Sequence, residues 1–211
     1  MTQIALDITM TLDGYVAGPN PTLEDPLGEN GMQLHEWVFP LRTWRAAHGM
    51  DGGEPNADDE LVARGLENLR ATVMGRKMFS GGSGPWEDDP NAAGWWGDEP
   101  PFRHPVFVVT HHPRESVTFE NGTTFLFVDG VEPAVSAARE AAGDGDVRVS
   151  GGAEIARGAL DAGLLDRIEL HVAPILLGGG TRLFDGAQVR QLELVEASSS
   201  PRVAHLSYRP T

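Results

Sequence analysis

The sequence contains no cysteine and no long apolar run, and these absences exclude several classes of protein. Without cysteine there can be no disulfide, no thiolate ligand for a metal and no cysteine nucleophile, and the composition agrees with a reducing compartment. A membrane-spanning helix needs about 20 consecutive apolar residues, which the chain does not have. Residues 4–16 are interrupted by Asp7, Thr9, Thr11 and Asp13, where a secretory signal would be continuously apolar. We therefore expect a soluble, cytoplasmic protein.

Positive charge is also scarce. The chain has 16 Lys and Arg residues against 31 Asp and Glu residues, which gives a formal net charge of −15. Binding to a nucleic-acid backbone depends on clustered Lys and Arg, so we expect no nucleic-acid partner. An anionic cofactor would have to be held locally, by a few cations and by backbone N–H groups.

The length of 211 residues, with 40% hydrophobic and 22% charged residues, is typical of one globular domain with a substantial core. Two long segments, at about 19–55 and 80–104, are rich in Gly, Pro and acidic residues and show little periodicity. Segments of this length are usually functional or disordered, and their tryptophans favour ordered loops. We expect a single domain over 1–211 with two irregular insertions.

Short apolar runs alternate with helical patterns through most of the chain. Residues 3–11 alternate apolar and polar side chains, which predicts a strand with one polar face. Residues 105–110 are almost continuously apolar, which favours a strand inside the sheet. The other predicted strands are 71–74, 123–128, 147–150, 168–173, 191–197 and 203–208, and the predicted helices are 56–69, 131–142 and 155–162. This alternation indicates an α/β fold with a mostly parallel sheet and an antiparallel C-terminal edge.

Three separated segments share the pattern of a nucleotide site. They are LDGYVAG (12–18), VMGRKMF (73–79) and VSGGAEIARGAL (149–160), and each contains a glycine after a predicted strand. A helix N-terminus presents unpaired N–H groups and partial positive charge, and glycine lets a phosphate approach the backbone. Arg76 and Lys77 add side-chain charge for a phosphate. The three segments together indicate a phosphorylated cofactor.

In order and spacing, these segments, with PVFVVTH (105–111) and AGLLDRIELHVAPILLGGGTRLF (162–184), resemble the dihydrofolate reductase-like superfamily. The similar branch is the C-terminal reductase domain of the riboflavin-biosynthesis bifunctional protein. The resemblance runs from Ile4 to about Tyr208. It implies a three-layer fold with a mixed sheet of about eight strands, NADPH bound across the C-terminal ends of the parallel strands, and a homodimer.

The resemblance also implies which residues contact the cofactor. Three groups would hold its phosphates and adenosine ribose, and a fourth would pass near the nicotinamide. They are Gly75, Arg76 and Lys77 beside the adenosine-side phosphates; Thr110 and His111 at the ribose and its 2′-phosphate; Gly151, Gly152, Ala153, Glu154 and Ile155 around the pyrophosphate; and Ala17 and Gly18 near the nicotinamide. In relatives the glycine turn of the third group often carries a non-proline cis peptide.

Three residues are candidates for catalysis. Asp59 lies 16 residues before Gly75, where folate-reducing relatives place the carboxylate that helps to protonate substrate, and Asp58 and Glu60 flank it within the error of this register. An acid in a first helical turn can equally be there to complement the helix dipole. Asp13 ends the first strand near the nicotinamide segment, although Asp-Gly is also a common turn pair. His171 corresponds to a small polar residue that supports the acid in relatives, or is a hydrogen-bonded core residue.

We expect hydride transfer from NADPH to an electron-poor C=N or C=O of a small planar heterocycle that resembles a pteridine, a pyrimidine or a flavin precursor. The alternative is a non-catalytic protein that binds a ligand or partner with the same fold. The absence of a deaminase domain argues against the riboflavin-pathway enzyme itself. We expect no metal site, because adjacent strand residues such as His111 and His112 point to opposite faces. The tryptophans of the two insertions either stack on a substrate or anchor their loops.

Overall fold

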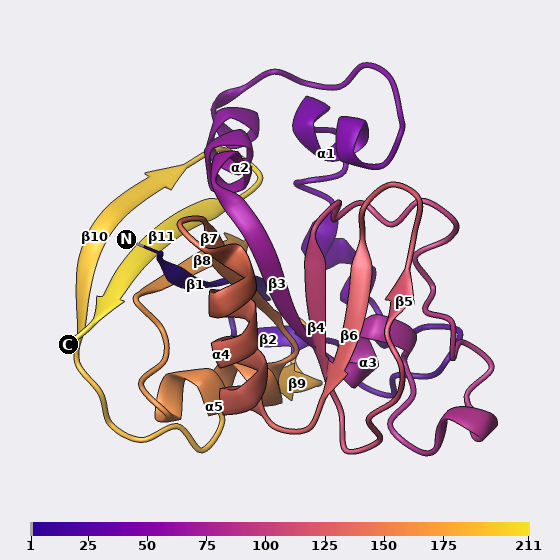
Figure 1. Cartoon of the computed structure of the whole chain (residues 1–211). Helices are drawn as coiled ribbons and strands as arrows, with labels where there is room; N and C mark the ends of the chain where they lie inside the picture. Colours follow the sequence, from indigo (N-terminus) through magenta and orange to yellow (C-terminus); the bar gives the residue numbers. More distant parts are fainter. Residues whose placement is uncertain (1) are drawn as a thin grey trace.

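A nine-stranded sheet forms the centre of the computed structural model, which describes residues 2–211 (Figure 1). The strand order is β10-β11-β8-β1-β7-β3-β4-β6-β5. The strands from β8 to β6 pair in parallel, and antiparallel strands flank them at both edges. The bounds are β1 Ile4–Thr11, β3 Leu69–Gly75, β4 Pro105–Val109, β5 Val117–Thr118, β6 Thr124–Val128, β7 Asp146–Gly151, β8 Arg167–Ala173, β10 Leu192–Ser199 and β11 Ala204–Pro210. The predicted fold class is confirmed, and β5 adds a second antiparallel edge.

A small second sheet lies at the end of β1. It pairs β2 (Tyr15–Ala17) with β9 (Thr181–Arg182) in antiparallel fashion. The sheet requires glycine at position 180, where φ is +120° and a Cβ atom would lie 2.1 Å from the carbonyl oxygen of Ala17. The sequence pattern does not reveal this sheet, because strands of two or three residues are too short to show a period.

The two faces of the large sheet differ in polarity. On one face Ile4, Leu6 and Ile8 of β1 join the main hydrophobic core. This face is covered by α4 (Val131–Ala142) and α5 (Ala153–Asp161), which lie side by side in front of the sheet in Figure 1. Because successive strand residues point to opposite faces, the polar residues of β1 lie on the other face. The predicted strand with one polar face is therefore confirmed.

The polar face is contacted by α2 (Ala57–Glu67). In its first turn, Asp58 is hydrogen-bonded to His205 of β11. In its last turn, the Gly65 carbonyl accepts a hydrogen bond from Arg148 of β7. Asn56 caps this helix, because its side chain accepts from the Asp59 N–H at 3.0 Å. The helix ends two residues earlier than the predicted limit of residue 69, since β3 begins there.

The insertion at 19–55 contains two short helices, of which one packs against β1 and β2 and the other against α2. They are η1 (Gly31–His35) and α1 (Arg42–Ala47). Trp37 and Leu41 are buried between them and form a small apolar cluster with Val203. Burial of this tryptophan explains why the segment is ordered despite its high content of Gly and Pro.

The insertion at 80–104 packs on the far half of the sheet. It follows α3 (Arg76–Ser80), contains the short helix η2 (Trp86–Asp88) and meets a second core cluster around β4 and β6. Trp86 lies edge-on to Phe79 and Phe127, with ring centroids 6.0 and 5.0 Å apart. This tryptophan therefore anchors its loop to the sheet.

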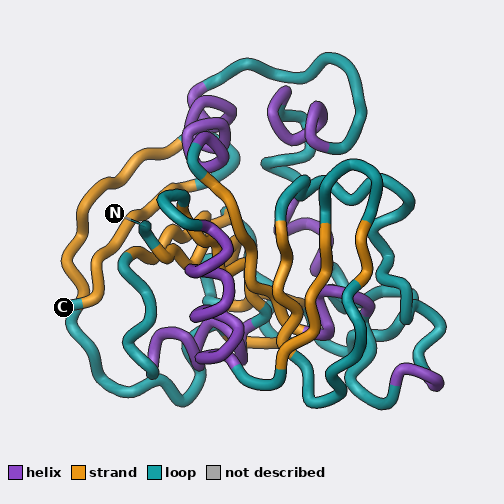
Figure 2. The backbone as a smooth tube through the Cα atoms, viewed as in Figure 1, coloured by secondary structure: helices purple, strands orange, loops and turns teal. Residues whose placement is uncertain are grey.

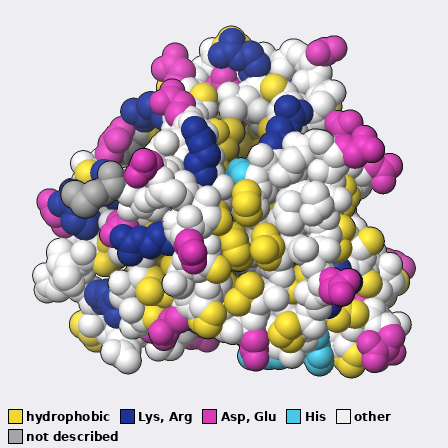
Figure 3. All heavy atoms as spheres, in the orientation of Figure 1, with side chains coloured by type: hydrophobic (Ala, Val, Ile, Leu, Met, Phe, Trp, Pro, Cys, Tyr) yellow, Lys and Arg dark blue, Asp and Glu magenta, His cyan; other side chains and the backbone are white. Residues whose placement is uncertain are grey.

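The two termini lie on the same side of the molecule, near β10 and β11 (Figure 2). Within residues 2–211, no helix combines the length and the apolar character that crossing a membrane requires. On the face shown in Figure 3, basic side chains are interspersed with acidic ones rather than gathered into one patch.

Candidate cofactor and substrate site

The carboxyl edge of the parallel sheet brings the two predicted glycine turns together. Because β7 and β3 are parallel neighbours, the turns that follow them start at the same edge. A Cβ atom at Gly75 would lie 3.0 Å from Ile155 Cγ1 and 3.5 Å from the Gly152 nitrogen. The Gly151–Gly152 peptide is cis, as the resemblance implied. The two turns, 76 residues apart in the sequence, therefore touch.

The start of α5 is open. No atom lies within 4 Å of where a Cβ at Gly152 would be, and this N-terminal cap residue has no side-chain hydrogen bond. Ala153 and Ile155 are buried beneath the first turn, whereas Glu154 is exposed. The backbone N–H groups of a helix start are strong anion donors. The open space at Gly152 leaves room for a phosphate beside them.

The side chain of Arg76 is buried against the insertion at 80–104. It is only 6% exposed, and its Nη1 donates to Asp89 Oδ2 at 2.5 Å and also to the Ser80 hydroxyl. Its guanidinium carbon lies 3.4 Å from the centre of the Trp86 ring, and Arg114 lies 3.7 Å from the same ring. We call these five residues the arginine cluster. Lys77 beside it is exposed.

The arginine cluster has more donors than acceptors. Nε and Nη2 of Arg76 and Nε of Arg114 are buried without a hydrogen-bond partner. Burial by itself would raise the pKa of Asp89, but hydrogen bonds from Ser80, from the Asn91 N–H and from Arg76 outweigh it and lower that pKa. The carboxylate therefore stays ionised. Two guanidiniums and one carboxylate leave one net positive charge with unpartnered donors.

The other predicted cofactor residues lie at the ends of β4 and β2. Thr110 is buried and accepts from the His112 N–H at 3.1 Å, whereas His111 is exposed and lies 2.9 Å from Asp129. Gly18 is packed under the neighbouring loop, since a Cβ there would be 2.0 Å from the Glu29 carbonyl oxygen. Ala17 belongs to β2 and is likewise approached by Gly180.

Asp13 fastens the loop after β8 to the end of β1. It accepts from the Thr11 hydroxyl at 2.5 Å and from the N–H groups of Leu177 and Gly178 at 3.3 and 2.8 Å. The Thr11 hydrogen bond is the main reason that the pKa of Asp13 is lowered. The structure thus places Asp13 in a turn-stabilising role.

Asp59 faces α1 rather than the sheet. Its Oδ1 accepts from the Thr43 N–H at 2.6 Å, and Arg42 lies 3.2 Å from its Oδ2. The carboxylate is fully buried in this contact. The neighbouring Asp58 is the acid that points to the sheet, where it lies 3.2 Å from His205 Nε2. Consecutive helical residues are about 100° apart around the axis, so Asp58 and Asp59 point in different directions. Asp59 therefore makes no direct contact with His171.

His171 belongs to a chain of polar side chains that crosses the polar face, buried at His171, His205 and Asp58 and partly exposed at Asp7 and Arg148. Its Nε2 lies 3.1 Å from Asp7 Oδ1 and its Nδ1 lies 2.7 Å from His205 Nδ1. Asp7 also pairs with Arg148 at 3.1 Å, and His205 with Asp58. We call these five residues the histidine chain. Sequence analysis missed Asp7, Arg148 and His205, and it named Asp58 only as a residue that flanks Asp59. The partners of each contact come from different elements, so their only sequence signal is a polar residue in an apolar strand or in a first helical turn.

The charges of the histidine chain shift the pKa values of its members. Burial tends to raise the pKa of Asp7, but Arg148 and then His171 lower it far below its usual range. Burial is the main reason that the pKa of His205 is lowered, and His171 adds to this effect while Asp58 opposes it.

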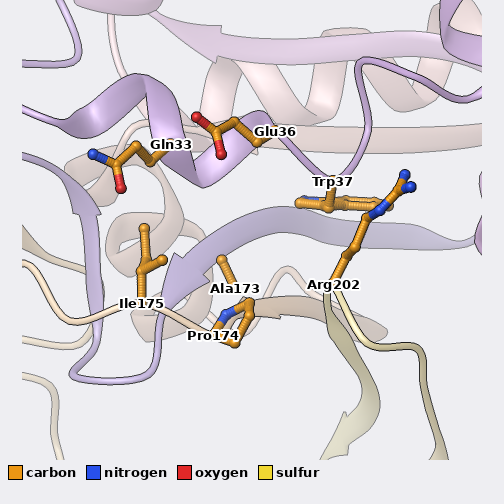
Figure 4. Close-up of a pocket in the computed structure, with 7 residues that line it drawn as sticks. All are labelled: Gln33, Glu36, Trp37, Ala173, Pro174, Ile175 and Arg202. Carbon is orange, nitrogen blue, oxygen red and sulfur yellow. The ribbon is translucent and has the colours of Figure 1, made fainter.

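A cavity of about 260 Å³ opens at the end of β8 (Figure 4). Gln33 and Glu36 lie on one side of it, and Ala173 and Pro174 on the other, with Trp37 between them and the histidine chain. The whole lining consists of Gln33, Glu36, Trp37, Ala173, Pro174, Ile175 and Arg202.

Trp37 is the shared wall between this cavity and the histidine chain. Its ring centroid lies 4.9 Å from that of His171 and 5.2 Å from that of His205, and its Nε1 donates to the Thr9 hydroxyl at 3.2 Å. Arg202, also at the cavity, is paired with Glu54 by two hydrogen bonds of 3.0 and 3.1 Å. The cavity therefore offers one flat aromatic wall and polar groups of both charges.

The sheet order, the parallel core and the open turn at its carboxyl edge define an α/β protein with a candidate ligand-binding edge. The family model described as the RibD C-terminal domain matches residues 2–206, and the chain belongs to this family. The resemblance inferred from the sequence motifs is thereby confirmed. Because this family is that of a reductase domain, membership supports an oxidoreductase.

Solved structures show the same fold. A protein from Shewanella sp. PV-4, provisionally named a riboflavin biosynthesis protein, has 20% identity and a TM-score of 0.62, with 100% of this chain and 99% of that chain covered. A diaminohydroxyphosphoribosylaminopyrimidine deaminase/5-amino-6-(5-phosphoribosylamino)uracil reductase from Thermotoga maritima has 15% identity and a TM-score of 0.56, and RibD from Acinetobacter baumannii has 15% and 0.55. Both cover all of this chain, which spans only 57% and 58% of theirs. No curated protein matches the sequence.

Proposed function

We propose that this protein is an NADPH-dependent reductase that transfers hydride to a small planar heterocycle of the pyrimidine or flavin-precursor type. The observation that carries the proposal is the pair of touching glycine turns, with open space at Gly152, next to a cavity at the end of β8. The glycine turns follow β7 and β3, and the cavity lies at the end of β8. Within the sheet, β1 is the one strand between β7 and β8. In open α/β sheets ligands bind at this carboxyl edge.

The residues present fit a phosphorylated cofactor. The open backbone at Gly152 and the first turn of α5 suit a pyrophosphate, and exposed Lys77 supplies a side-chain cation. The arginine cluster supports an additional phosphate, because it holds a net positive charge and the unpartnered donors of Arg76. When bound, NADPH supplies the hydride, whereas the protein binds and orients it.

The cavity suits a small flat substrate. Its volume of about 260 Å³ lies just below the range of about 300–1,000 Å³ that is usual for ligand sites. Trp37 offers an aromatic surface, while the Gln33 amide and the Glu36 carboxylate can bond to ring N–H and C=O groups. Of the predicted stacking tryptophans, Trp37 is the one at this cavity, and Trp86 is packed within the arginine cluster.

A comparison of two glycines tests cofactor binding. Gly152→Val should raise the Kd for NADPH at least about tenfold, because a branched side chain would fill the space proposed for the phosphate. The matched control is Gly65→Val, since position 65 also lacks a positive φ and a Cβ there would meet only the Arg148 guanidinium, at an ordinary 3.6 Å, but it lies at the end of α2, where β3 begins, at the opposite edge of the sheet. Quenching of tryptophan fluorescence measures both, with NADH titrated in parallel. Saturable binding that is equal in the two variants would contradict the proposed site, and no binding of either cofactor by the unmodified protein would favour the non-catalytic alternative.

We also propose that the protein is a homodimer that associates through the sheet edge at β10. All eight residues of this edge strand are exposed, and they include Leu192, Leu194 and Val195. Unpaired edge strands with apolar side chains favour pairing with another chain. Light scattering after size exclusion should give twice the chain mass, and Leu194→Lys should give the monomer.

A further inference from the structure

The histidine chain forms an unbroken row of contacts across four neighbouring strands. It passes from Arg148 on β7 through Asp7 on β1 and His171 on β8 to His205 on β11, and it ends at Asp58 on α2. The two imidazoles are 7% and 5% exposed, so water does not replace these contacts. Each of the four ring nitrogens has one partner in the row.

The contacts determine the number of protons on the two imidazoles. The Nδ1 atoms face each other, so one must carry a proton and the other a lone pair. Each Nε2 faces a carboxylate, of Asp7 or of Asp58, and a carboxylate can only accept, so both Nε2 atoms must carry protons. The pair therefore needs three ring protons, whereas two neutral imidazoles have only two. The third proton makes the pair a monocation.

This protonation state also balances the charges. Arg148 and the shared proton together offset the carboxylates of Asp7 and Asp58. A buried charge is costly unless it is paired, so balance favours retention of the proton.

Other charged or titratable groups near the row have partners of their own. Arg202, near Asp58, is paired with Glu54, and His104, near Arg148, contacts the Thr72 hydroxyl. Glu169 accepts from the Ser207 hydroxyl, to which Arg167 also donates. Asp59, beside Asp58, is paired with Arg42. Burial is the main reason that the pKa of Glu169 is raised, and the nearby Asp7 carboxylate adds to this effect.

We propose that His171 and His205 hold a single shared proton and that this charged pair positions Trp37 at the wall of the cavity. The indole contacts both imidazoles, and a cation is attracted to an aromatic ring at such distances. The hydrogen bond from Trp37 to Thr9 determines the position of one end of the ring, and the imidazole pair supports its flat surface. The proposal concerns the free protein and does not rest on the reductase activity.

The number of protons limits the pH range over which the arrangement holds. A fourth proton would place the Nδ1–H of His171 against the Nδ1–H of His205 and separate the two rings. Loss of the third proton would leave one Nε2 lone pair facing the carboxylate of Asp7 or Asp58. Burial is the main reason that the pKa of His205 is lowered, which disfavours uptake of the fourth proton. The support of Trp37 should change with that uptake.

Nitrogen NMR of the full chain labelled with ¹⁵N-histidine tests the proton count. At neutral pH we expect three protonated ring nitrogens and one unprotonated nitrogen in the His171–His205 pair. Two protonated nitrogens, as in two neutral rings, would overturn the proposal, and so would four. This measurement uses the unmodified protein, so it stands even where a variant fails to fold.

Fluorine NMR of protein labelled with 5-fluorotryptophan tests the link to Trp37, whose signal is assigned by its loss in Trp37→Phe. We expect the Trp37 signal to shift with pH at the midpoint of the histidine titration, and His205→Gln to abolish that shift. The matched control is His48→Gln, because His48 also stacks on a tryptophan, Trp44, at 3.9 Å but is exposed and outside the row. A Trp37 signal that does not change with pH in the unmodified protein would overturn the positioning role. NADPH binding is not used, so failure of the proposed function would leave both readouts intact.

Discussion

The arginine cluster and the histidine chain both bury charge on the sheet, but they differ in how that charge is matched. The arginine cluster has two permanently charged guanidiniums against one carboxylate, and it leaves buried donors unpartnered. In the histidine chain every ring nitrogen has a partner, and the charges balance once a proton is shared. Arginine does not titrate in proteins, whereas histidine does so near neutral pH. The first cluster is thus suited to an incoming anion, and the second to a retained proton.

The largest effect is expected from Asp58→Ala. Removing one partner of a buried ion pair leaves the other uncompensated, so the free energy of unfolding should fall by about 3 kcal/mol. Urea denaturation measures it. The matched control is Glu60→Ala, because Glu60 lies in the same first turn of α2 but is exposed, and only the dipole term of about 0.3–1 kcal/mol is lost there. Equal losses in both variants would mean that the contact of Asp58 with His205 contributes nothing.

Asp89→Asn should have the next largest effect and should separate the two clusters. Without the carboxylate, the guanidiniums of Arg76 and Arg114 repel each other, and we expect a loss of about 2 kcal/mol in the free energy of unfolding. Inorganic phosphate should restore part of this loss, because an anion can take the place of the carboxylate, but it should restore nothing in Asp58→Ala. Asp88→Asn, at an exposed neighbouring position, is the control. If phosphate stabilised both cluster variants equally, the distinction between them would be wrong.

The smallest effect concerns His104, which immediately precedes β4 and contacts the Thr72 hydroxyl of β3 at 2.8 Å. Burial, followed by Arg148 and Arg70, lowers the pKa of His104 to about 4. The unfolded chain therefore binds more protons than the folded one between about pH 4 and 6.5, and stability falls as pH drops through that window. Between pH 7 and pH 5 this group should account for a loss of about 1–2 kcal/mol.

The His104 effect is measured as the difference in unfolding free energy between pH 7 and pH 5. His104→Gln retains a hydrogen-bonding group but cannot titrate, so its pH dependence should be shallower by that amount. His48→Gln should keep the full slope. A slope unchanged in His104→Gln would assign the pH dependence to the histidine chain instead.

Much of the fold followed from local patterns. The period of apolar residues predicted the helix at 131–142 with the same bounds as α4, and the alternation in β1 predicted its polar face. The site was less predictable from residues alone. Gly151 and Gly152 were found through the strand-glycine-helix pattern, but nothing local distinguished Asp58 from Asp59, since both fit the first turn of α2. The two acids are distinguished only by tertiary packing, because α1 contacts Asp59 through the Thr43 N–H and Asp58 is left to face the sheet.

What the sequence by itself determined is the alternation of strands and helices, and with it the edge where parallel strands end and the glycine turns meet. These properties follow from periodicity and from backbone geometry, which act over a few residues. Only the tertiary structure decided which charges meet. Asp89 reaches Arg76 from 13 residues away, and Asp7 reaches His171 from 164 residues away. Pairing over such separations depends on which strands become neighbours and on the free energy of burying charge, and neither is encoded in any single segment.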